Sequence, residues 1–332
     1  MLIVDTHLDL SDMALEGRDL TLPALEQPPG KHGPNVVGFP DLRVGGVGLI
    51  CGTLFTGPEV YRRNGVDDPA AAHQHAAGQI RWYNQQEQAG RLHLVRRRSG
   101  LPVESDPGHS LHTIILMENA DPIQRPADAG WWFTQGVRIV GMAWRRTRYA
   151  GGTGAPGGLT PIGRELVREL DNVGMIHDIS HLSEASFWDL VELSSGPIMA
   201  SHSNCRALIN TDRQISDGMI RAIAQRGGVV GINFFDRFLI PAAERQRRRA
   251  TLADVMAHVK HICNVLGDAD HIGLGTDFDG GLGRNDVPEE ITTAADLPRI
   301  GDAAARAGFS DADIRRFLQG NWLGFFRGAL PE

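Results

Sequence analysis

A histidine and an aspartate, two residues apart, close the first apolar run of the chain. The run covers residues 2–9 and reads LIVDTHLD, with His7 and Asp9 at its end. In a β-strand, residues i and i+2 project to the same face, so a strand here would present one imidazole and one carboxylate together. Both groups are good ligands for divalent metals. The pair therefore indicates half of a metal site, and the rest of the chain must supply the other half.

Four further polar residues stand in comparable positions. Glu118, His181, His202 and Asp277 each follow a short apolar run rich in β-forming residues. The C-terminal ends of the strands of a parallel barrel converge on one face, and catalytic residues gather there. The shared position carries more weight than any single residue, because most of the 13 histidines of such a chain simply pack or face solvent. We expect these residues to meet His7 and Asp9 in one cluster.

The composition of this cluster predicts a two-metal site. Neutral imidazoles and carboxylates are borderline ligands that suit zinc or a similar divalent ion. Three histidines and two carboxylates are too many for one catalytic zinc with an open position, but they suffice for two ions if one carboxylate bridges. Two such ions, roughly 3.5–4 Å apart, can hold a hydroxide, lower its pKa toward about 7 and polarise a carbonyl. The predicted chemistry is hydrolysis, with two Zn²⁺ as cofactors.

Eight apolar, β-prone runs recur along the chain and must position these residues. They cover residues 2–6, 47–55, 113–117, 137–143, 175–179, 197–200, 228–234 and 271–275. Most are apolar on both alternating faces, which is typical of strands in a buried parallel sheet. Helix-like segments lie between most of them. The alternation predicts an α/β fold, a (β/α)8 TIM-type barrel forming a single domain over residues 1–332, with a doubly wound open sheet as the alternative.

Helix boundaries are clearest after the fourth run. Thr160 and Pro161 form an N-cap and first helical position, and Gly174 ends that helix. Further helices are expected at residues 183–193, 254–266 and 311–317. Two stretches rich in glycine or proline, residues 23–46 and 150–158, are expected to be long surface or active-site loops.

Bulk properties exclude several classes of protein. The net charge of −7 argues against nucleic-acid binding through released counterions. The three cysteines form no Cys-x-x-Cys motif, which is typical of a reduced compartment. No secretory signal and no apolar run of the roughly 18–20 residues that a membrane span needs is visible. We expect a cytoplasmic enzyme with no membrane or nucleic-acid partner.

Five short motifs carry a resemblance to a known family. They are DTHLD at residues 5–9, GLTPIG at 158–163, DISHLS at 178–183, SHSN at 201–204 and GTDFDG at 275–280. In this combination and order the chain resembles the membrane (renal) dipeptidase family of the amidohydrolase superfamily, from Leu2 to about Phe326. The resemblance implies a (β/α)8 barrel with two zinc ions, a small peptide as substrate and, at the family level, a homodimer.

The resemblance also implies a role for each matching residue. His7 and Asp9 match ligands of the first zinc, Glu118 the bridging carboxylate, His181 and His202 ligands of the second zinc, and Asp277 the acid/base residue. Arg213, eleven residues after His202, matches the arginine that holds the terminal carboxylate of the substrate. A planar guanidinium suits that task because it can donate two parallel hydrogen bonds to a carboxylate. The implied activity is hydrolysis of dipeptides, including those with a C-terminal D-residue.

The sequence departs from the family pattern at two positions. The bridging glutamate is usually followed by two glycines, whereas Glu118 is followed by Asn119 and Ala120. The fourth strand usually ends in a histidine that contacts the substrate carbonyl, and here Trp144 takes that place. Indole has one N–H donor but cannot ionise. Both changes predict an altered substrate pocket, and Trp144 has a packing role as its alternative.

Other readings stay open at this point. The same metal site could serve a related amidohydrolase acting on N-acyl amino acids, lactams or lactones, or a metal-binding barrel without catalysis. Asp279 could replace Asp277 as the acid/base residue, and Asp178 could either orient a ligand histidine or be an ordinary buried carboxylate. A nucleotide-binding protein is disfavoured, because the glycine-rich loop 151–158 contains no Gly-x-x-x-x-Gly-Lys-Ser/Thr motif.

Overall fold

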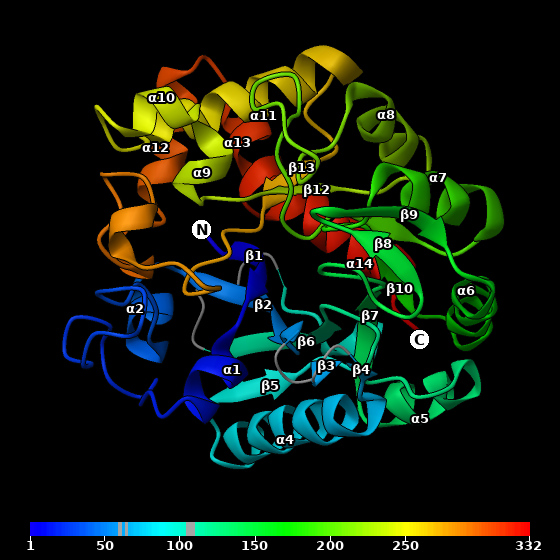
Figure 1. The fold of residues 1–332 in the computed structure, drawn as a ribbon. Helices are drawn as coiled ribbons and strands as arrows, with labels where there is room; N and C mark the ends of the chain where they lie inside the picture. Colours follow the sequence, from blue (N-terminus) through cyan, green and yellow to red (C-terminus); the bar gives the residue numbers. More distant parts are fainter. Residues whose placement is uncertain (59–61, 64–65, 104–109) are drawn as a thin grey trace.

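Eight parallel strands form a closed barrel at the centre of the molecule. The computed structural model describes residues 1–58, 62–63, 66–103 and 110–332 (Figure 1). The barrel strands are β1 (Ile3–Leu8), β2 (Val47–Leu54), β6 (Leu111–Met117), β7 (Val137–Gly141), β10 (Ile176–Asp178), β11 (Ile198–Met199), β12 (Val230–Ile232) and β13 (Ile272–Leu274). Their order is β11-β10-β7-β6-β2-β1-β13-β12. A parallel bridge between Ala200 and Val230 joins the two ends of this order. The predicted barrel is therefore confirmed, and the open-sheet alternative is wrong.

Helices surround the barrel, as Figure 1 shows. They are α1 (Leu10–Leu15), α2 (Phe39–Val44), α4 (Pro69–Gln88), α5 (Ala129–Thr134), α6 (Pro161–Val173), α7 (Glu184–Leu193), α8 (Asp217–Gln225), α9 (Asp236–Leu239), α10 (Ala242–Arg245), α11 (Leu252–Leu266), α12 (Arg299–Arg306), α13 (Asp311–Arg315) and α14 (Asn321–Ala329). Short additional strands are β3 (Arg62–Arg63), β4 (Val66–Asp67), β5 (Leu92–Leu94), β8 (Ala150–Gly152) and β9 (Ala155–Leu159). None of the helices in the described ranges is long and apolar enough to cross a bilayer.

The helix boundaries predicted around α6 are confirmed by its caps. The Thr160 side chain accepts a hydrogen bond from the Gly163 N–H at the start of α6. Gly174 ends the helix in the left-handed conformation, with φ of 75°. A residue with a β-carbon would be strained there, so glycine makes this a sharp stop.

Three elements differ from the expectation. Residues 23–46 are not wholly irregular, because they contain the short helix α2. Residues 150–158 fold mainly as the antiparallel hairpin β8–β9 rather than as an open loop. Strand β5 pairs with the first half of β6 outside the barrel path. Glycine-rich and three-residue strands have little intrinsic preference for the extended state, so their pairing depends on tertiary contacts that the sequence pattern does not reveal.

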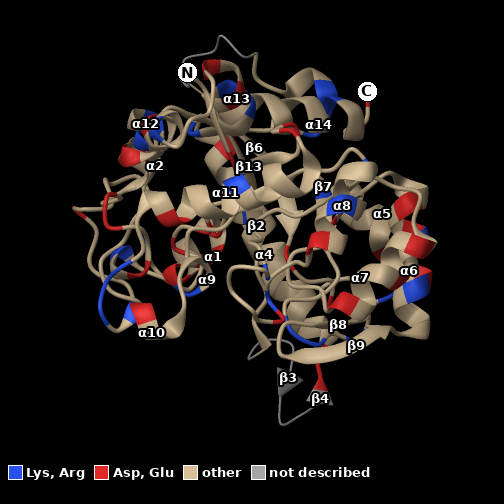
Figure 2. Ribbon diagram, turned by 90° about the horizontal axis from the view of Figure 1, so that it is seen from above, with Lys and Arg blue, Asp and Glu red and all other residues tan. Residues whose placement is uncertain are grey.

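The two ends of the barrel differ in polarity. At the N-terminal ends of the strands, the interior is filled by apolar side chains such as Leu2, Val4 and Ile114, which pack with residues of α14. Trp322 of α14 closes this end, and its indole N–H donates to the carbonyl of Leu274 at 3.1 Å. Figure 2 shows both termini at this end of the molecule and the β8–β9 hairpin at the opposite end. The apolar plug leaves only the other end available for polar chemistry.

A buried carboxylate attaches the loop of residues 23–46 to the polar end of the barrel. Asp279, beyond β13, accepts hydrogen bonds from the backbone N–H groups of Val36 (3.0 Å) and Val37 (2.9 Å). The guanidinium of Arg18 forms an ion pair with the same carboxylate at 2.8 Å. Burial raises the pKa of Asp279, while the charge and hydrogen bond of Arg18 oppose that shift. Asp279 therefore holds this loop at the polar end of the barrel. We call its contacts with Arg18, Val36 and Val37 the loop clasp.

Substituting Asp279 with alanine should destabilise the protein by about 3–5 kcal/mol, because it leaves the nearly buried charge of Arg18 without its counter-ion. Urea unfolding with zinc in excess measures this loss. The matched control is Arg125→Ala, which removes an exposed ion pair with Asp128 and should leave the unfolding midpoint unchanged. An equal midpoint for Asp279→Ala and Arg125→Ala would contradict the clasp.

Candidate metal centre

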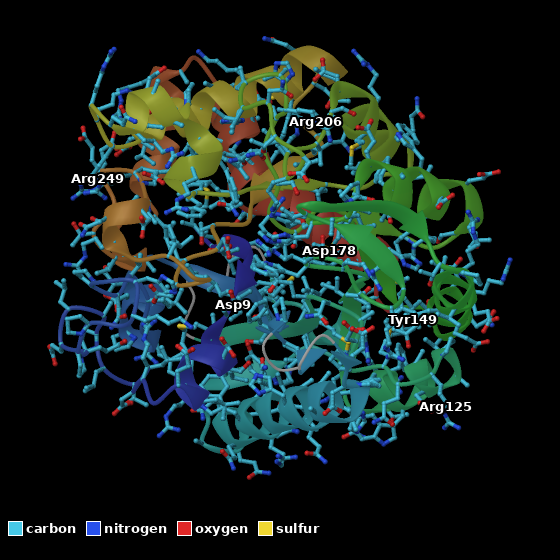
Figure 3. The ribbon with its side chains drawn as sticks, viewed as in Figure 1. Asp9, Arg125, Tyr149, Asp178, Arg206 and Arg249 are labelled. Atoms are coloured by element: carbon cyan, nitrogen blue, oxygen red, sulfur yellow. The ribbon has the colours of Figure 1, made fainter. Side chains whose placement is uncertain are left out.

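The carboxyl ends of four strands bring the five predicted ligands together. His7 lies in β1 and Asp9 directly follows it, Glu118 is the first residue after β6, and His181 and His202 each lie three residues beyond β10 and β11. All five side chains are buried. Figure 3 places Asp9 near the middle of the molecule, beside strand β1, whereas Arg125 and Arg249 lie at its periphery.

Asp9 reaches the cluster in a different way from that expected. Strand β1 ends at Leu8, and Asp9 is already the residue that precedes helix α1, with φ of −86° and ψ of 41°. The alternation of a strand therefore does not orient this side chain. Its carboxylate instead accepts a hydrogen bond from the hydroxyl of Thr53 at the end of β2. Asp9 does lie beside His7 as expected. The turn after β1 and the hydrogen bond to Thr53 of β2 place it there, rather than strand alternation.

One carboxylate oxygen lies at the centre of the cluster. Glu118 Oε1 is 3.6 Å from His7 Nε2, 3.4 Å from His181 Nε2 and 3.7 Å from His202 Nε2. Asp9 Oδ1 is 3.9 Å from His7 Nε2. Ligand atoms of His7, His202 and Asp277 lie within 4.8 Å of one another, and so do those of two other sets, His7-Asp9-Glu118 and Glu118-His181-His202. The latter two sets share Glu118, which is the arrangement that a bridging carboxylate requires.

The donor atoms fit divalent cations. Two atoms bound to one tetrahedral Zn²⁺ at about 2.1 Å lie about 3.4 Å apart, close to the spacings above. The Nε2 atom of His7 is buried and has no hydrogen-bond partner among the described residues. His181 Nε2 and His202 Nε2 face each other at 3.0 Å. Burial lowers the pKa of both rings well below the usual value, so both stay neutral and present lone pairs.

The buried carboxylates of the cluster also need nearby positive charge to stay ionised. Burial, and then the negative charge of Asp178, raises the pKa of Glu118 to about 8. Burial also raises the pKa of Asp9 and of Asp277, and the nearby Glu118 charge adds to both shifts. A β-carbon at Gly280 would lie 2.1 Å from Asp277 Oδ1 and 2.5 Å from Asp9 Oδ2, so glycine leaves room for both carboxylates. Metal ions would replace the protons that otherwise relieve this crowding.

Asp277 faces the cavity beside the cluster in a fixed orientation. Its Oδ2 accepts from Asn233 Nδ2 at 2.9 Å, and its backbone N–H donates to the carbonyl of His7 at 3.2 Å. Asn233 is itself oriented, because its Oδ1 accepts the Phe235 N–H at 2.7 Å. Asp279, the alternative acid/base residue, has its carboxylate engaged by the loop clasp. The geometry therefore favours Asp277.

Backbone strain is concentrated at this site. In the described ranges, the non-glycine residues with positive φ are His181 (67°), Asp277 (63°) and Asp279 (63°). Such conformations are costly for residues with a β-carbon, and they persist where the surrounding structure imposes them. Two of the three belong to the predicted site and the third forms its clasp.

A small cavity of about 190 Å³ opens onto the cluster. Phe55, Trp144, Phe235 and Phe238 contribute to its wall, opposite the carboxylates. The Trp144 ring lies 5.8 Å from the His181 ring and 5.6 Å from that of Phe55. Trp144 is thus both a packed residue and a wall of the cavity. The volume is below the roughly 300–1,000 Å³ of drug-sized ligand sites, so it suits a small ligand.

Arg213 and Asn119 lie behind the cluster rather than in the cavity lining. The Arg213 guanidinium donates to the carbonyl of His202 at 2.6 Å and to Ser203 Oγ at 3.2 Å, and its Nε has no partner among the described residues. The Asn119 amide donates to the carbonyl of Thr56 and accepts from the backbone of Asp121. Asn119 therefore braces a loop, and it is not among the residues that line the cavity.

The structure adds polar residues around the ligands that sequence reasoning left undecided or missed. Asp178 points inward and contacts Ser201, which lies against two of the histidines. Thr153, at the turn between β8 and β9, contacts His181 Nδ1 at 3.0 Å. The motifs contain Asp178 and Ser201 but not Thr153, and only strand register and hairpin placement reveal the contacts of these residues.

Comparison with known families agrees with this geometry. The family model described as membrane dipeptidase (Peptidase family M19) matches residues 1–329. The chain belongs to the membrane dipeptidase family. Its members are metallopeptidases that hydrolyse peptide bonds, so this chain is a hydrolase of that class.

Solved structures of similar fold extend over the whole chain. A crystal structure described as dipeptidase AC, a metallopeptidase, is 26% identical, with a TM-score of 0.84 and coverage of 100% of this chain and 99% of that chain. A metallopeptidase from Rhodobacter sphaeroides, liganded with a phosphinate mimic of the dipeptide L-Ala-D-Ala, is 25% identical, with a TM-score of 0.83 and 99% coverage of both chains.

Relatives found by sequence match only part of this chain. Dipeptidase tcpJ of Claviceps purpurea is 33% identical over 174 residues, which are 51% of this chain and 38% of that protein. An uncharacterized Klebsiella pneumoniae protein encoded in the pqqA 5′ region is 34% identical over 201 residues, 58% of this chain and 72% of that protein.

The raised pKa values predict that metal binding releases protons. With its pKa near 8 in the metal-free protein, Glu118 is mostly protonated at pH 7 and must lose this proton to bind Zn²⁺. Affinity should therefore fall as the pH is lowered from 8 to 6. Calorimetric titration of Zn²⁺ in buffers of different ionisation enthalpy measures the proton release, and the absence of release at pH 7 would contradict the assignment.

The same shift predicts the pH dependence of the metal-free protein. The folded-state pKa of Glu118 lies above its unfolded value of about 4.3. Its stabilising contribution is complete below the unfolded pKa and is lost as the pH rises through about 8. Chelation should thus lower the melting temperature more at pH 8 than at pH 6, and an opposite trend would exclude this group as its source.

Proposed function

We propose that this protein is a binuclear zinc-dependent dipeptidase that hydrolyses the peptide bond of free dipeptides. The observation that carries the proposal is the central position of Glu118 Oε1, within 3.4–3.7 Å of Nε2 of the three candidate ligand histidines His7, His181 and His202. A single metal would leave part of this ligand set unused. Two ions sharing Glu118 would use His7 and Asp9 on one side and His181 and His202 on the other.

The chain's own residues supply proton transfer and orientation. Zinc ions in the cluster would lower the pKa of a water molecule and polarise the scissile carbonyl. Asp277 then accepts the proton of the attacking water and returns it to the leaving amine, acting first as general base and then as general acid. Asn233 holds Asp277 Oδ2 at 2.9 Å, which leaves Oδ1 directed toward the cluster, 4.0 Å from His7 Nε2.

Two further side chains are assigned to substrate recognition. Arg213 is buried outside the cavity lining, with its guanidinium carbon 5.2 Å from the ring of the cavity-lining Phe238. In the proposal, the C-terminal carboxylate reaches past this ring to the N–H groups that remain after the bonds of Arg213 to His202 and Ser203, including the unpartnered Nε. Trp144 forms part of the cavity wall, and its indole N–H is a donor for a substrate carbonyl.

The stereochemistry of the substrate is part of the proposal. The related enzyme from Rhodobacter sphaeroides binds a mimic of L-Ala-D-Ala. We extend this to the present chain and propose that dipeptides with a C-terminal D-residue are substrates. The second candidate is hydrolysis of N-acyl amino acids, lactams or lactones, which Trp144 favours because it replaces an ionisable contact with an apolar wall.

A substrate panel tests the proposal. Zinc-loaded protein should hydrolyse L-L and L-D dipeptides faster than N-acyl amino acids, lactams and lactones. The Asp277→Asn variant should retain its zinc and lose about 10²–10⁴-fold in kcat, because only the proton-transferring group is changed. Preference for N-acyl substrates would support the second candidate. Bound zinc without turnover on the panel would indicate a catalytically silent barrel, and full activity of Asp277→Asn would remove its assigned role.

Removing the Arg213 side chain tests the carboxylate contact. Arg213→Ala should raise KM for free dipeptides roughly tenfold or more, as expected for the loss of a charged hydrogen bond. Dipeptides with an amidated C-terminus are the control, because they present no carboxylate. An equal change in KM for both substrate types would instead assign Arg213 to supporting the His202 backbone.

A further inference from the structure

Ser201 contacts two ligand histidines that belong to different metal groups. Its Oγ lies 3.1 Å from His7 Nδ1 and 2.7 Å from His202 Nδ1. Of the two groups that share Glu118, His7 belongs to the one with Asp9 and His202 to the one with His181, and both histidines also lie in a third group with Asp277. The His7 and His202 rings are also close, with centroids 3.6 Å apart. One buried hydroxyl thus touches both halves of the centre on the side facing away from the metals.

Asp178 determines which way the hydroxyl hydrogen points. Ser201 Oγ lies 2.6 Å from Asp178 Oδ2, while the competing Ser180 Oγ is 3.3 Å away. Asp178 Oδ1 accepts the backbone N–H groups of Ser180 (3.0 Å) and Ser201 (2.8 Å). A carboxylate surrounded by three donors is an acceptor, so the hydroxyl donates its single hydrogen to Asp178. The two lone pairs of Ser201 Oγ are then left to accept.

We infer that Asp178 and Ser201 form a positioning pair that fixes both His7 and His202 as Nδ1–H tautomers and thereby couples the two metal sites. Each imidazole donates its Nδ1–H to one lone pair of Ser201 Oγ. Each Nε2 is then necessarily unprotonated and directed at the cluster, as a metal ligand must be. Because the hydroxyl has no third lone pair, it is fully used by this arrangement.

The surroundings hold Ser201 in place with little freedom. Its carbonyl accepts the Thr6 hydroxyl at 2.7 Å, and this hydroxyl also lies 2.9 Å from the carbonyl of Leu274. β-carbons at Gly231 and Gly275 would lie 2.1 Å and 1.8 Å from the Ser201 carbonyl oxygen, so neighbouring strands approach it as closely as glycine permits. A side chain fixed this tightly can orient its partners without large loss of entropy on metal binding.

The third histidine provides an internal contrast. Within the described part of the chain, His181 Nδ1 contacts Thr153 Oγ1 at 3.0 Å and makes no hydrogen bond with Ser201. Thr153 comes from the β8–β9 turn and touches one ligand only. Loss of the Thr153 hydroxyl should therefore affect one metal, whereas loss of the Ser201 hydroxyl should affect both.

The experiment measures Zn²⁺ affinity and stoichiometry by competition with a chromophoric chelator, and the absorption spectrum of the Co²⁺-loaded protein. Ser201→Ala should weaken both Zn²⁺ by roughly 10–100-fold. Thr153→Val, the matched control, removes a hydroxyl of similar position but should weaken only one. Asp178→Asn keeps the shape of the side chain, and its amide would donate to Ser201 Oγ. The serine hydrogen would then turn toward one imidazole, so metal affinity should fall and the Co²⁺ spectrum should change.

This inference rests on the proposed binuclear site, and the outcomes separate the two. Wild-type protein that binds fewer than two Zn²⁺ overturns the proposed function and, with it, this inference. Wild-type protein that binds two, with unchanged affinities in Ser201→Ala or with loss of only one metal, overturns the coupling alone. If Ser201→Ala fails to fold, the near-isosteric Asp178→Asn variant provides the test. The inference is overturned if this variant has the same Zn²⁺ affinities and the same Co²⁺ spectrum as the wild-type protein.

Discussion

The central constraint of this structure is the burial of three carboxylates, Asp9, Glu118 and Asp277, at the mouth of one barrel. Burial raises the pKa of all three, and the charge of Glu118 adds to the shifts of Asp9 and Asp277. For Glu118 itself, the negative charge of Asp178 adds to the effect of burial, and the charge of Arg213, which lies behind the cluster, opposes it. The neutral imidazoles of His181 and His202 add lone pairs rather than charge. Such a cluster is stable only if its carboxylates are protonated or bind cations. Its composition therefore indicates metal binding, in agreement with the family relationship.

The fold meets this constraint by separating the two ends of the barrel. One end is filled with buried apolar side chains and closed by Trp322 of α14, whose indole N–H donates to the carbonyl of Leu274. At the other end, each ligand sits at or just beyond a strand, where backbone hydrogen bonds of the sheet fix its position. Residues that would be strained elsewhere, His181 and Asp277, are held at positive φ by these neighbours. Rigid strands thus supply the precision that a two-metal site needs.

The sequence predicted the parts of this arrangement that depend on local pattern. All eight barrel strands correspond to apolar runs, and polar residues at their ends mark the ligands, because strand period and strand end are local properties. The contacts of Ser201 with Asp178 were not predictable in the same way. Asp178 pairs with Met199 across β10 and β11, so Ser201, two residues further, shares its face. That register is a tertiary property. The hairpin carrying Thr153 was missed for the same reason, since its glycines have no strand preference of their own.

Trp144 shows how the metal site and the substrate site can diverge within one fold. The ligand set lies on strand ends that the sheet fixes, whereas Trp144 follows β7 and packs against Phe55 and His181 at the cavity wall. An indole can donate one hydrogen bond, but it cannot take up or release a proton at neutral pH. Trp144 therefore takes no part in the proton transfers of the proposed reaction. Asp277 lies outside both metal groups that share Glu118, although it forms a third group with His7 and His202, and an amide, that of Asn233, orients it. The proposed reaction therefore assigns the acid–base role to Asp277, while Trp144 forms part of the aromatic wall of the cavity.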